Sequence, residues 1–148
     1  MRFLLVDRIL ELEALKRIVA TKEISPDEDY FPDHFPGHPI VPGVLQVEMM
    51  AQSAGKCLMA GIDADLWPVL LQVRQANFRK PVPPGSKLRI EAEITACNRN
   101  TAAAQAKIHC DGQVMSDAAL MFGFIQKSLL PQGFQDEVLS AYLRGQGK

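Results

Sequence analysis

A histidine and a glutamate, separated by a stiff loop, are the residues of this sequence whose types and spacing best suit acid–base chemistry. Between His34 and Glu48 the chain contains three prolines and two glycines. Proline fixes the backbone φ angle and glycine permits close approach of the backbone, so the loop is expected to hold one shape. Rigid loops position catalytic groups well.

Glu48 is expected about one turn inside a helix whose other residues are mostly apolar. Such surroundings favour a neutral carboxyl, which can give a proton to a leaving hydroxyl while a neutral imidazole takes a proton from carbon. This pairing suits the elimination of water. The N–H of Gly43, at the start of the helix, has no acceptor within the helix and could bind a carbonyl oxygen as negative charge builds there.

Each of these residues also has an ordinary structural explanation. His34 alone could be a structural or surface histidine, and Glu48 alone could bond to nearby backbone or sit at a subunit contact. Gly43 alone could simply begin the helix. His38, beside Pro39 in the same loop, is interpreted as structural or exposed.

Length and composition bound the class of protein. The chain has 148 residues, of which 47% are hydrophobic, and this predicts one domain spanning 1–148 with its own core. A net charge of -1 gives no support for nucleic acid or an anionic membrane as partner. Neither a signal peptide nor a membrane span is indicated, so a cytoplasmic protein is expected.

The cysteines do not indicate a site. Cys57, Cys97 and Cys110 are odd in number and lack CxxC spacing, which argues against a disulfide framework or a zinc site. We predict that all three are buried packing residues and that the protein binds no metal.

The apolar pattern predicts one long helix and several antiparallel strands. The helix is expected over 44–59, with apolar residues nearly all round it, as in a helix surrounded by protein. Strands are predicted at 17–25, 67–78, 87–96, 102–110 and 114–124, with a tight hairpin at Asp111-Gly112. A short helix is predicted over 132–144, within a C-terminal tail of 132–148.

This order of elements favours an α+β hot-dog fold, in which a curved antiparallel sheet wraps an apolar helix. The competing ferredoxin-like fold needs a second long helix between strands. No segment after Leu58 supplies one.

The loop and helix carry a specific resemblance to the (3R)-hydroxyacyl-[acyl carrier protein] dehydratases of the FabZ type, which act in bacterial fatty-acid synthesis. The similarity extends from about Leu5 to Phe124. The segments that match in residue type and spacing are His34-Phe35-Pro36-Gly37-His38-Pro39, Pro42-Gly43-Val44-Leu45, Glu48, Ala51-Gln52, the run from Asn77 to Gly85, and Val6-Asp7-Arg8.

The resemblance implies an enzyme with no metal or organic cofactor, paired as a homodimer and often assembled as a trimer of dimers. It implies that His34 of one subunit removes the C2 proton and that Glu48 of the other protonates the departing hydroxyl. The Gly43 amide would bind the thioester carbonyl, the Ile40 carbonyl would orient the imidazole, and Gln52 would support Glu48.

The implied partner is acyl carrier protein, whose phosphopantetheine arm would deliver the substrate. Arg79 and Lys80, with Arg74 and Arg99, are candidates for docking this acidic protein. Apolar side chains for the acyl channel are available at Leu45, Met49, Met50, Phe78 and Phe35.

Two features bear on which reaction to expect. The related FabA type, a dehydratase-isomerase, carries aspartate where this chain has Glu48, which favours simple dehydration. Three features depart from the family pattern: the unusual run from Asp29 to Asp33, Val41 in place of a frequent methionine, and the tail from Gln132. They leave the acyl chain length and the pathway open. A hot-dog thioesterase and a non-catalytic acyl-carrier-binding relative are the alternatives.

Overall fold

The computed structural model of the chain describes residues 1–130 and 135–146. In chain order the elements are β1 (Arg8–Glu13), β2 (Arg17–Glu23), α1 (Gly43–Met59), β3 (Leu66–Phe78), β4 (Lys87–Cys97), β5 (Thr101–Cys110), β6 (Gln113–Gln126), the 3₁₀ turn η1 (Lys127–Leu129) and α2 (Glu137–Gln146).

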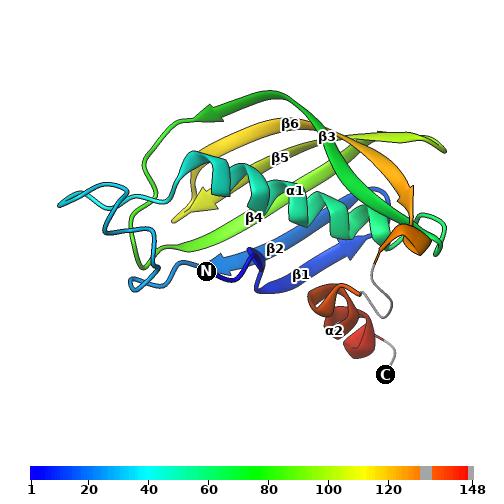
Figure 1. Cartoon of the computed structure of the whole chain (residues 1–148), viewed down its shortest axis with the longest axis horizontal. Coiled ribbons are helices and arrows are strands. Elements are labelled where there is room, and N and C mark those ends of the chain that lie inside the picture. Colours follow the sequence, from blue (N-terminus) through cyan, green and yellow to red (C-terminus); the bar gives the residue numbers. More distant parts are fainter. Residues whose placement is uncertain (131–134, 147–148) are drawn as a thin grey trace.

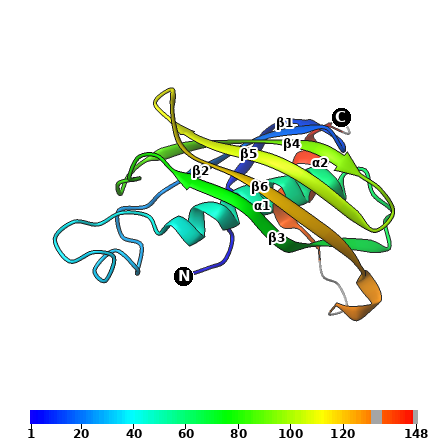
Figure 2. The ribbon, with the colours of Figure 1, turned by 90° about the horizontal axis from the view of Figure 1, so that it is seen from above.

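The strands form one antiparallel sheet in the order β1-β2-β4-β5-β6-β3. The sheet curves around α1, which lies along its concave face (Figure 1), and the view from above places the helix on one side of the sheet (Figure 2). The predicted hot-dog arrangement is therefore confirmed.

Burial explains why the helix needs this wrapping. Met49, Met50 and Leu58 of α1 are fully buried. Strand β4 alternates in the expected way, with Leu88 and Ile90 buried against the helix and Arg89 exposed on the other face. Because most of the circumference of α1 is covered, apolar residues occur on most of its faces.

The helix and the five predicted strands are all present, with ends that differ by a few residues. Strand β1 was not predicted, because its outward side chains include Leu10, which blurs the alternation. Its turn to β2 passes through Leu15 at φ 61°, and the Leu15 N–H donates to the Cys57 carbonyl at 3.2 Å. The hairpin at Asp111-Gly112 is confirmed, with φ of 51° and 78°.

A C-terminal helix is present but starts later than predicted. Helix α2 begins at Glu137, because the Asp136 carboxylate accepts the Leu139 N–H at 2.8 Å and so caps it. Residues 132–134 of the predicted helix lie outside the described residues. Helix α2 packs beside β1 (Figure 1), and its Leu139 is buried.

Strand β3 is an edge of the sheet and is unusually apolar for one. Its Leu70, Leu71 and Val73 are exposed by 37%, 62% and 42%. Pro68, which lacks an N–H, is tolerated there because an edge strand has one unpaired side. An exposed apolar edge strand is a surface suited to pairing with another strand.

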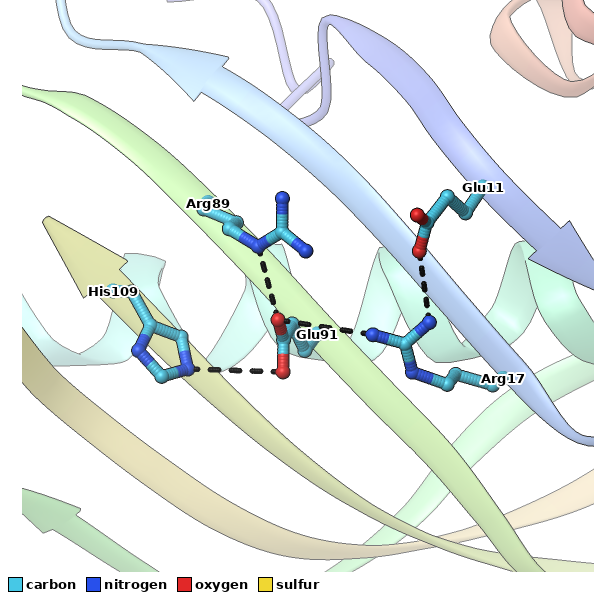
Figure 3. A network of polar contacts seen from close by, with 5 residues as sticks. All are labelled: Glu11, Arg17, Arg89, Glu91 and His109. Atoms are coloured by element: carbon cyan, nitrogen blue, oxygen red, sulfur yellow. Dashed lines mark hydrogen bonds and ion pairs between the residues drawn. The ribbon is translucent and has the colours of Figure 1, made fainter. Parts of the chain in front are cut away.

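The face of the sheet turned away from α1 is charged instead. Arg89 and Arg17 both contact Glu91, at 2.9 and 3.9 Å, and Arg17 also reaches Glu11 at 2.8 Å, while His109 lies 3.9 Å from Glu91 (Figure 3). Such partly exposed pairs suit a solvated surface. In the part of the chain that the structure describes, neither helix combines the length and apolar character needed to cross a bilayer.

Candidate active site

The loop before α1 is anchored near its C-terminal end by two hydrogen bonds of the Val41 backbone. The Val41 N–H donates to the Val82 carbonyl at 2.8 Å, and the buried Gln46 side chain donates from Nε2 to the Val41 carbonyl at 3.2 Å. The loop reaches beyond the end of the sheet in both views (Figure 1, Figure 2). It therefore presents its residues outside the body of the chain while its base stays fixed.

His34 is held in this loop by Ile40. The imidazole Nδ1 lies 3.1 Å from the Ile40 carbonyl oxygen, and the Ile40 N–H donates back to the His34 carbonyl at 3.0 Å. A carbonyl oxygen only accepts, so Nδ1 carries the proton and Nε2 of the neutral ring is left as the acceptor. The ring also stacks on Phe35 at 4.1 Å, across a cis peptide bond.

Gly43 is the first residue of α1, after Pro42 at the N-cap position. At that position the N–H has no acceptor within the helix. A Cβ on Gly43 would lie 3.0 Å from two carbons of the Phe78 ring, so the close approach of this ring suits glycine. The amide lies at the positive end of the helix.

Glu48 is half-buried in the single chain and is bonded by Gln52. The Gln52 Nε2 donates to Glu48 Oε1 at 3.1 Å and also to the Phe3 carbonyl at 3.0 Å. The Gln52 Oε1 accepts the Leu5 N–H at 3.0 Å. The two backbone contacts fix which way the amide points, so an N–H is directed at Oε1 and Oε2 is left for other partners.

Glu48 and Gln52 line a cavity of about 670 Å³. Its walls are residues 2–4, one face of α1, the start of β3 and Phe122 of β6, with residues 135–137 at one side. The lining is mixed, with aromatic and aliphatic side chains beside the carboxyl group. A cavity of this kind suits a flexible apolar chain that carries a reacting group at one end.

The single chain separates the predicted residues into two groups. His34 meets Ile40 and Phe35, whereas Glu48 meets Gln52. Among residues 1–130 and 135–146, no hydrogen bond or ring contact joins His34 to Glu48. His38 is exposed, as the ordinary interpretation predicted.

The candidate docking cations are on the surface and already have partners. Arg79 Nε donates to Asp117 Oδ2 at 2.7 Å, and Lys80 Nζ donates to Gln113 Oε1 at 2.7 Å. Hydrogen bonds from Asn77 and then Arg79 hold the pKa of Asp117 below its usual value.

The apolar channel candidates divide between core and surface. Met49 and Met50 are fully buried in the core, while Phe35 and Phe78 are about half exposed and remain available to a ligand.

The prediction for the cysteines was partly wrong. Cys57 is buried, and burial raises the pKa of its thiol to about 11, but Cys97 is exposed and Cys110 is intermediate. Cys97 ends β4, where residues 95–97 are all exposed, so the alternation of the strand no longer implies burial there. No group of three or more side chains suited to holding a metal ion occurs among the described residues.

Sequence reasoning missed the ion pair at the cavity. Lys56 Nζ lies 2.9 Å from Asp136 Oδ2, and both residues line the cavity. A lysine within a helix normally indicates an exposed face, and nothing in the local sequence pairs it with an aspartate eighty residues later.

Comparison with known proteins agrees with the family resemblance seen in the sequence. The model of the FabA-like domain family matches residues 1–119. The chain is 42% identical over 131 residues to a 3-hydroxyacyl-[acyl-carrier-protein] dehydratase FabZ of Geotalea uraniireducens (strain Rf4), covering 85% of this chain and 89% of that one. It is 40% identical over 128 residues to the FabZ of Syntrophotalea carbinolica (strain DSM 2380 / NBRC 103641 / GraBd1), covering 85% and 87%.

The fold is also similar to solved structures of low sequence identity. A Streptococcus mutans protein bound to acetyl CoA superposes with a TM-score of 0.67 at 16% identity, covering 85% of this chain and 94% of that one.

Proposed function

Because the chain belongs to the family of FabA-like domains, we propose that it is a lyase that removes water from (3R)-hydroxyacyl-acyl carrier protein to give the trans-2-enoyl thioester in fatty-acid synthesis. Two observations support this assignment within the chain: Gln52 contacts Glu48 inside a cavity, and a separate loop holds His34 in a defined tautomer. An acid, a base and a carbonyl-binding amide are the groups that such an elimination needs.

The proposed reaction assigns one step to each group. His34 Nε2 takes the proton from C2 of the substrate, and the electron pair left behind forms the C2–C3 double bond. The C3–O bond breaks as Glu48, protonated on Oε2, gives its proton to the hydroxyl, which leaves as water. The Gly43 N–H stabilises the negative charge that develops on the thioester oxygen. Return of the His34 proton to Glu48 restores the enzyme.

The neighbours of these residues act by positioning. The Ile40 carbonyl holds the proton on Nδ1 of His34, which leaves Nε2 free to act as base. The Gln52 N–H occupies Oε1 of Glu48, which leaves Oε2 to carry the transferable proton. Neither positioning residue needs to touch the substrate.

We propose that the functional unit is a homodimer in which the two subunits share each active site. His34 and Glu48 lie in separate groups within one chain, and a second copy offers the missing partner for each. The exposed apolar edge strand β3 is the surface that we assign to this pairing, because it has both unpaired backbone groups and apolar side chains. Further association into a trimer of dimers is part of the proposal.

We propose acyl carrier protein as the partner of this protein. Arg79 and Lys80, beside the end of β3, are the cations that we assign to its docking. Elimination of water involves no net oxidation or reduction, and the proposal assigns its proton transfers and the departure of the hydroxyl to side chains of the protein, so the proposed chemistry uses no cofactor beyond the carrier's phosphopantetheine. We assign the whole chain to one domain and its location to the cytoplasm.

The direct test is mass analysis of a (3R)-hydroxyacyl-acyl carrier protein after incubation with the protein. Loss of one water supports the proposal, and His34→Ala and Glu48→Ala are each expected to lower turnover by roughly 10²-fold or more. Loss of the entire acyl group would instead identify a thioesterase. Tight carrier binding without any product would identify a non-catalytic relative.

Mixing the two inactive variants tests the shared site. A mixed dimer of His34→Ala and Glu48→Ala chains contains one site with both mutations and one with neither, so activity returns on mixing after subunits exchange. Size measurement by light scattering distinguishes a dimer from a hexamer. A fully active monomer would contradict the shared arrangement.

A further inference from the structure

The loop that carries His34 joins α1 through three consecutive peptide units, and hydrogen bonds hold each of them. The first unit contains the Ile40 carbonyl, 3.1 Å from His34 Nδ1, and the Val41 N–H, which donates to the Val82 carbonyl at 2.8 Å. In a trans peptide these two groups point in opposite directions, so the unit is held from both sides. Any rotation of this peptide would break the contact with His34.

The acceptor of the Val41 N–H lies in a stiff part of the chain. Val82 is fully buried and stands between Pro81 and Pro83, whose rings fix the backbone φ angle. This segment, between β3 and β4, lies at the same end of the sheet as the loop that carries His34 (Figure 1). The first peptide unit therefore has a firm support on its N–H side.

The third peptide unit is held by the helix itself. The Pro42 carbonyl accepts the Leu45 N–H at 3.1 Å and the Gln46 N–H at 3.2 Å. Because this carbonyl points into α1, the Gly43 N–H on the other side of the same peptide points out of the N-terminal end of the helix. This is the N–H that the proposed reaction uses for the thioester oxygen.

The middle unit, from Val41 to Pro42, has only one hydrogen-bonding group, because proline has no N–H. Gln46 is 3% exposed, and its Nε2 donates to the Val41 carbonyl at 3.2 Å. The ring of Pro42 fixes φ at -55°, so a fixed Val41 carbonyl also fixes the step from the first unit to the third. Gln46 therefore joins the peptide that holds His34 to the peptide that presents the Gly43 N–H.

Packing alone does not explain a glutamine at this position. Among residues 1–130 and 135–146, the Gln46 Oε1 atom is buried and has no hydrogen-bond partner. An unpaired buried oxygen costs free energy, which an apolar side chain of the same length would avoid. That apolar side chain would leave the Val41 carbonyl unpaired instead, so the two costs are of the same kind. The contact with the Val41 carbonyl is what distinguishes glutamine from an apolar residue here.

We infer that Gln46 is a positioning residue, which aligns His34 and the Gly43 N–H with each other through the Val41 carbonyl. The inference rests on the proposed function, because it takes His34 as the base and the Gly43 N–H as the donor to the thioester oxygen. Two groups that act on one substrate must be aligned together, and a misplacement of about 1 Å can slow a reaction by roughly 10²-fold. Gln46 has this effect without touching the substrate.

Gln46→Met is the main test, since it keeps the length of the side chain and removes the donor. We expect kcat for dehydration to fall by about tenfold while KM changes by less than about threefold, because alignment acts in the transition state and not on binding. The melting temperature is expected to stay within about 3 °C, because one unpaired oxygen replaces another. A fall of about 10 °C or more, or a failure to fold, would make Gln46 a packing residue and overturn the inference.

Ser53→Ala is the matched control. Ser53 is fully buried in the same helix, and its Oγ donates to the Met49 carbonyl at 2.8 Å. This variant also removes a hydrogen bond from a buried side chain to a backbone carbonyl, but away from the loop. Its kcat is expected to stay within about twofold of that of the unmodified protein. Equal losses of kcat in Ser53→Ala and Gln46→Met would show a general effect of weakening α1 and would overturn the inference.

The tautomer of His34 is a measurement that needs no turnover. Nuclear magnetic resonance of ¹⁵N-labelled protein at a pH where the imidazole is neutral distinguishes a proton on Nδ1 from one on Nε2, and His34→Asn identifies the signals. We expect Nδ1–H in the unmodified protein and a mixture of both tautomers in Gln46→Met, because the Ile40 carbonyl is held less firmly. An unchanged tautomer in Gln46→Met overturns the inference. Absence of dehydration by the unmodified protein overturns the proposed function instead, and the tautomer still decides whether Gln46 positions His34.

Discussion

Replacement of Gln52 by leucine tests whether one side-chain amide joins the N-terminal segment to α1. The change keeps a side chain of similar size but removes every hydrogen bond of the amide. The Leu5 N–H loses its acceptor in a residue that is only 4% exposed, whereas the Phe3 carbonyl is accessible to water. An unpaired buried N–H costs about 1–3 kcal/mol, so we expect the free energy of unfolding to fall by about 2 kcal/mol.

The assay is urea unfolding followed by circular dichroism at one fixed protein concentration, because association contributes to apparent stability. A loss of about 2 kcal/mol corresponds to a melting temperature lower by roughly 4–8 °C for a chain of this size. Gln105→Leu is the control, since Gln105 is exposed on β5, and its effect is expected to stay within about 0.5 kcal/mol. If both variants lose the same small amount, the amide does not hold the N-terminal segment and our reasoning is refuted.

Three further predictions concern single residues. In Gly43→Ala the new Cβ would lie 3.0 Å from the Phe78 ring, which is half exposed and can yield, so we expect stability to change by less than about 1 kcal/mol. Turnover in the same variant is expected to fall at least tenfold as the amide site is displaced; normal kinetics would remove this amide from the mechanism. Iodoacetamide at pH 8 is expected to label Cys97 well before Cys57, whose pKa of about 11 and burial keep it unreactive; peptide mapping that finds equal rates would contradict this. The hydrogen bond from Arg89 holds the pKa of Glu91 below its ordinary value of 4.5. The stabilisation of the folded chain by this ionised carboxylate is therefore present above pH 4.5 and is lost as the pH falls through the lowered folded pKa. Arg89→Ala is therefore expected to reduce the melting temperature at neutral pH but not in strong acid, and an equal reduction at both would show that the carboxylate is not involved.

The sequence predicted the fold well because its strongest signals were local. The alternation of β4 and the φ-positive pair Asp111-Gly112 each depend on neighbouring residues, and both appear in the structure. Strand β1 was missed because Leu10 faces outward, so the segment does not alternate cleanly. Local patterns therefore sufficed except where an apolar residue is exposed.

The candidate site was predictable where its contacts are close in sequence. The Gln52 contact of Glu48 spans four residues and follows from helical spacing, whereas the Ile40 contact of His34 spans six and was implied by the family resemblance; both contacts are present. Their catalytic roles stay predictions. The Lys56–Asp136 pair joins residues eighty positions apart, and its burial depends on how the C-terminal segment returns to the helix. The spacing of residues in the sequence does not predict such a contact.

The strand order has a consequence for how the chain reaches its native state. Among the described strands, β3 pairs only with β6, which ends at Gln126, and β2 pairs with β4 across about seventy intervening residues. During synthesis, the apolar helix and β3 therefore emerge well before the strands that cover them. Such long-range pairing is typical of slow folding, in the range of milliseconds to seconds, with transient exposure of apolar surface. We expect nascent chains that stop before β6 to bind chaperones and to aggregate, and chains released after Gln126 to fold, which sedimentation of stalled chains of graded length would measure.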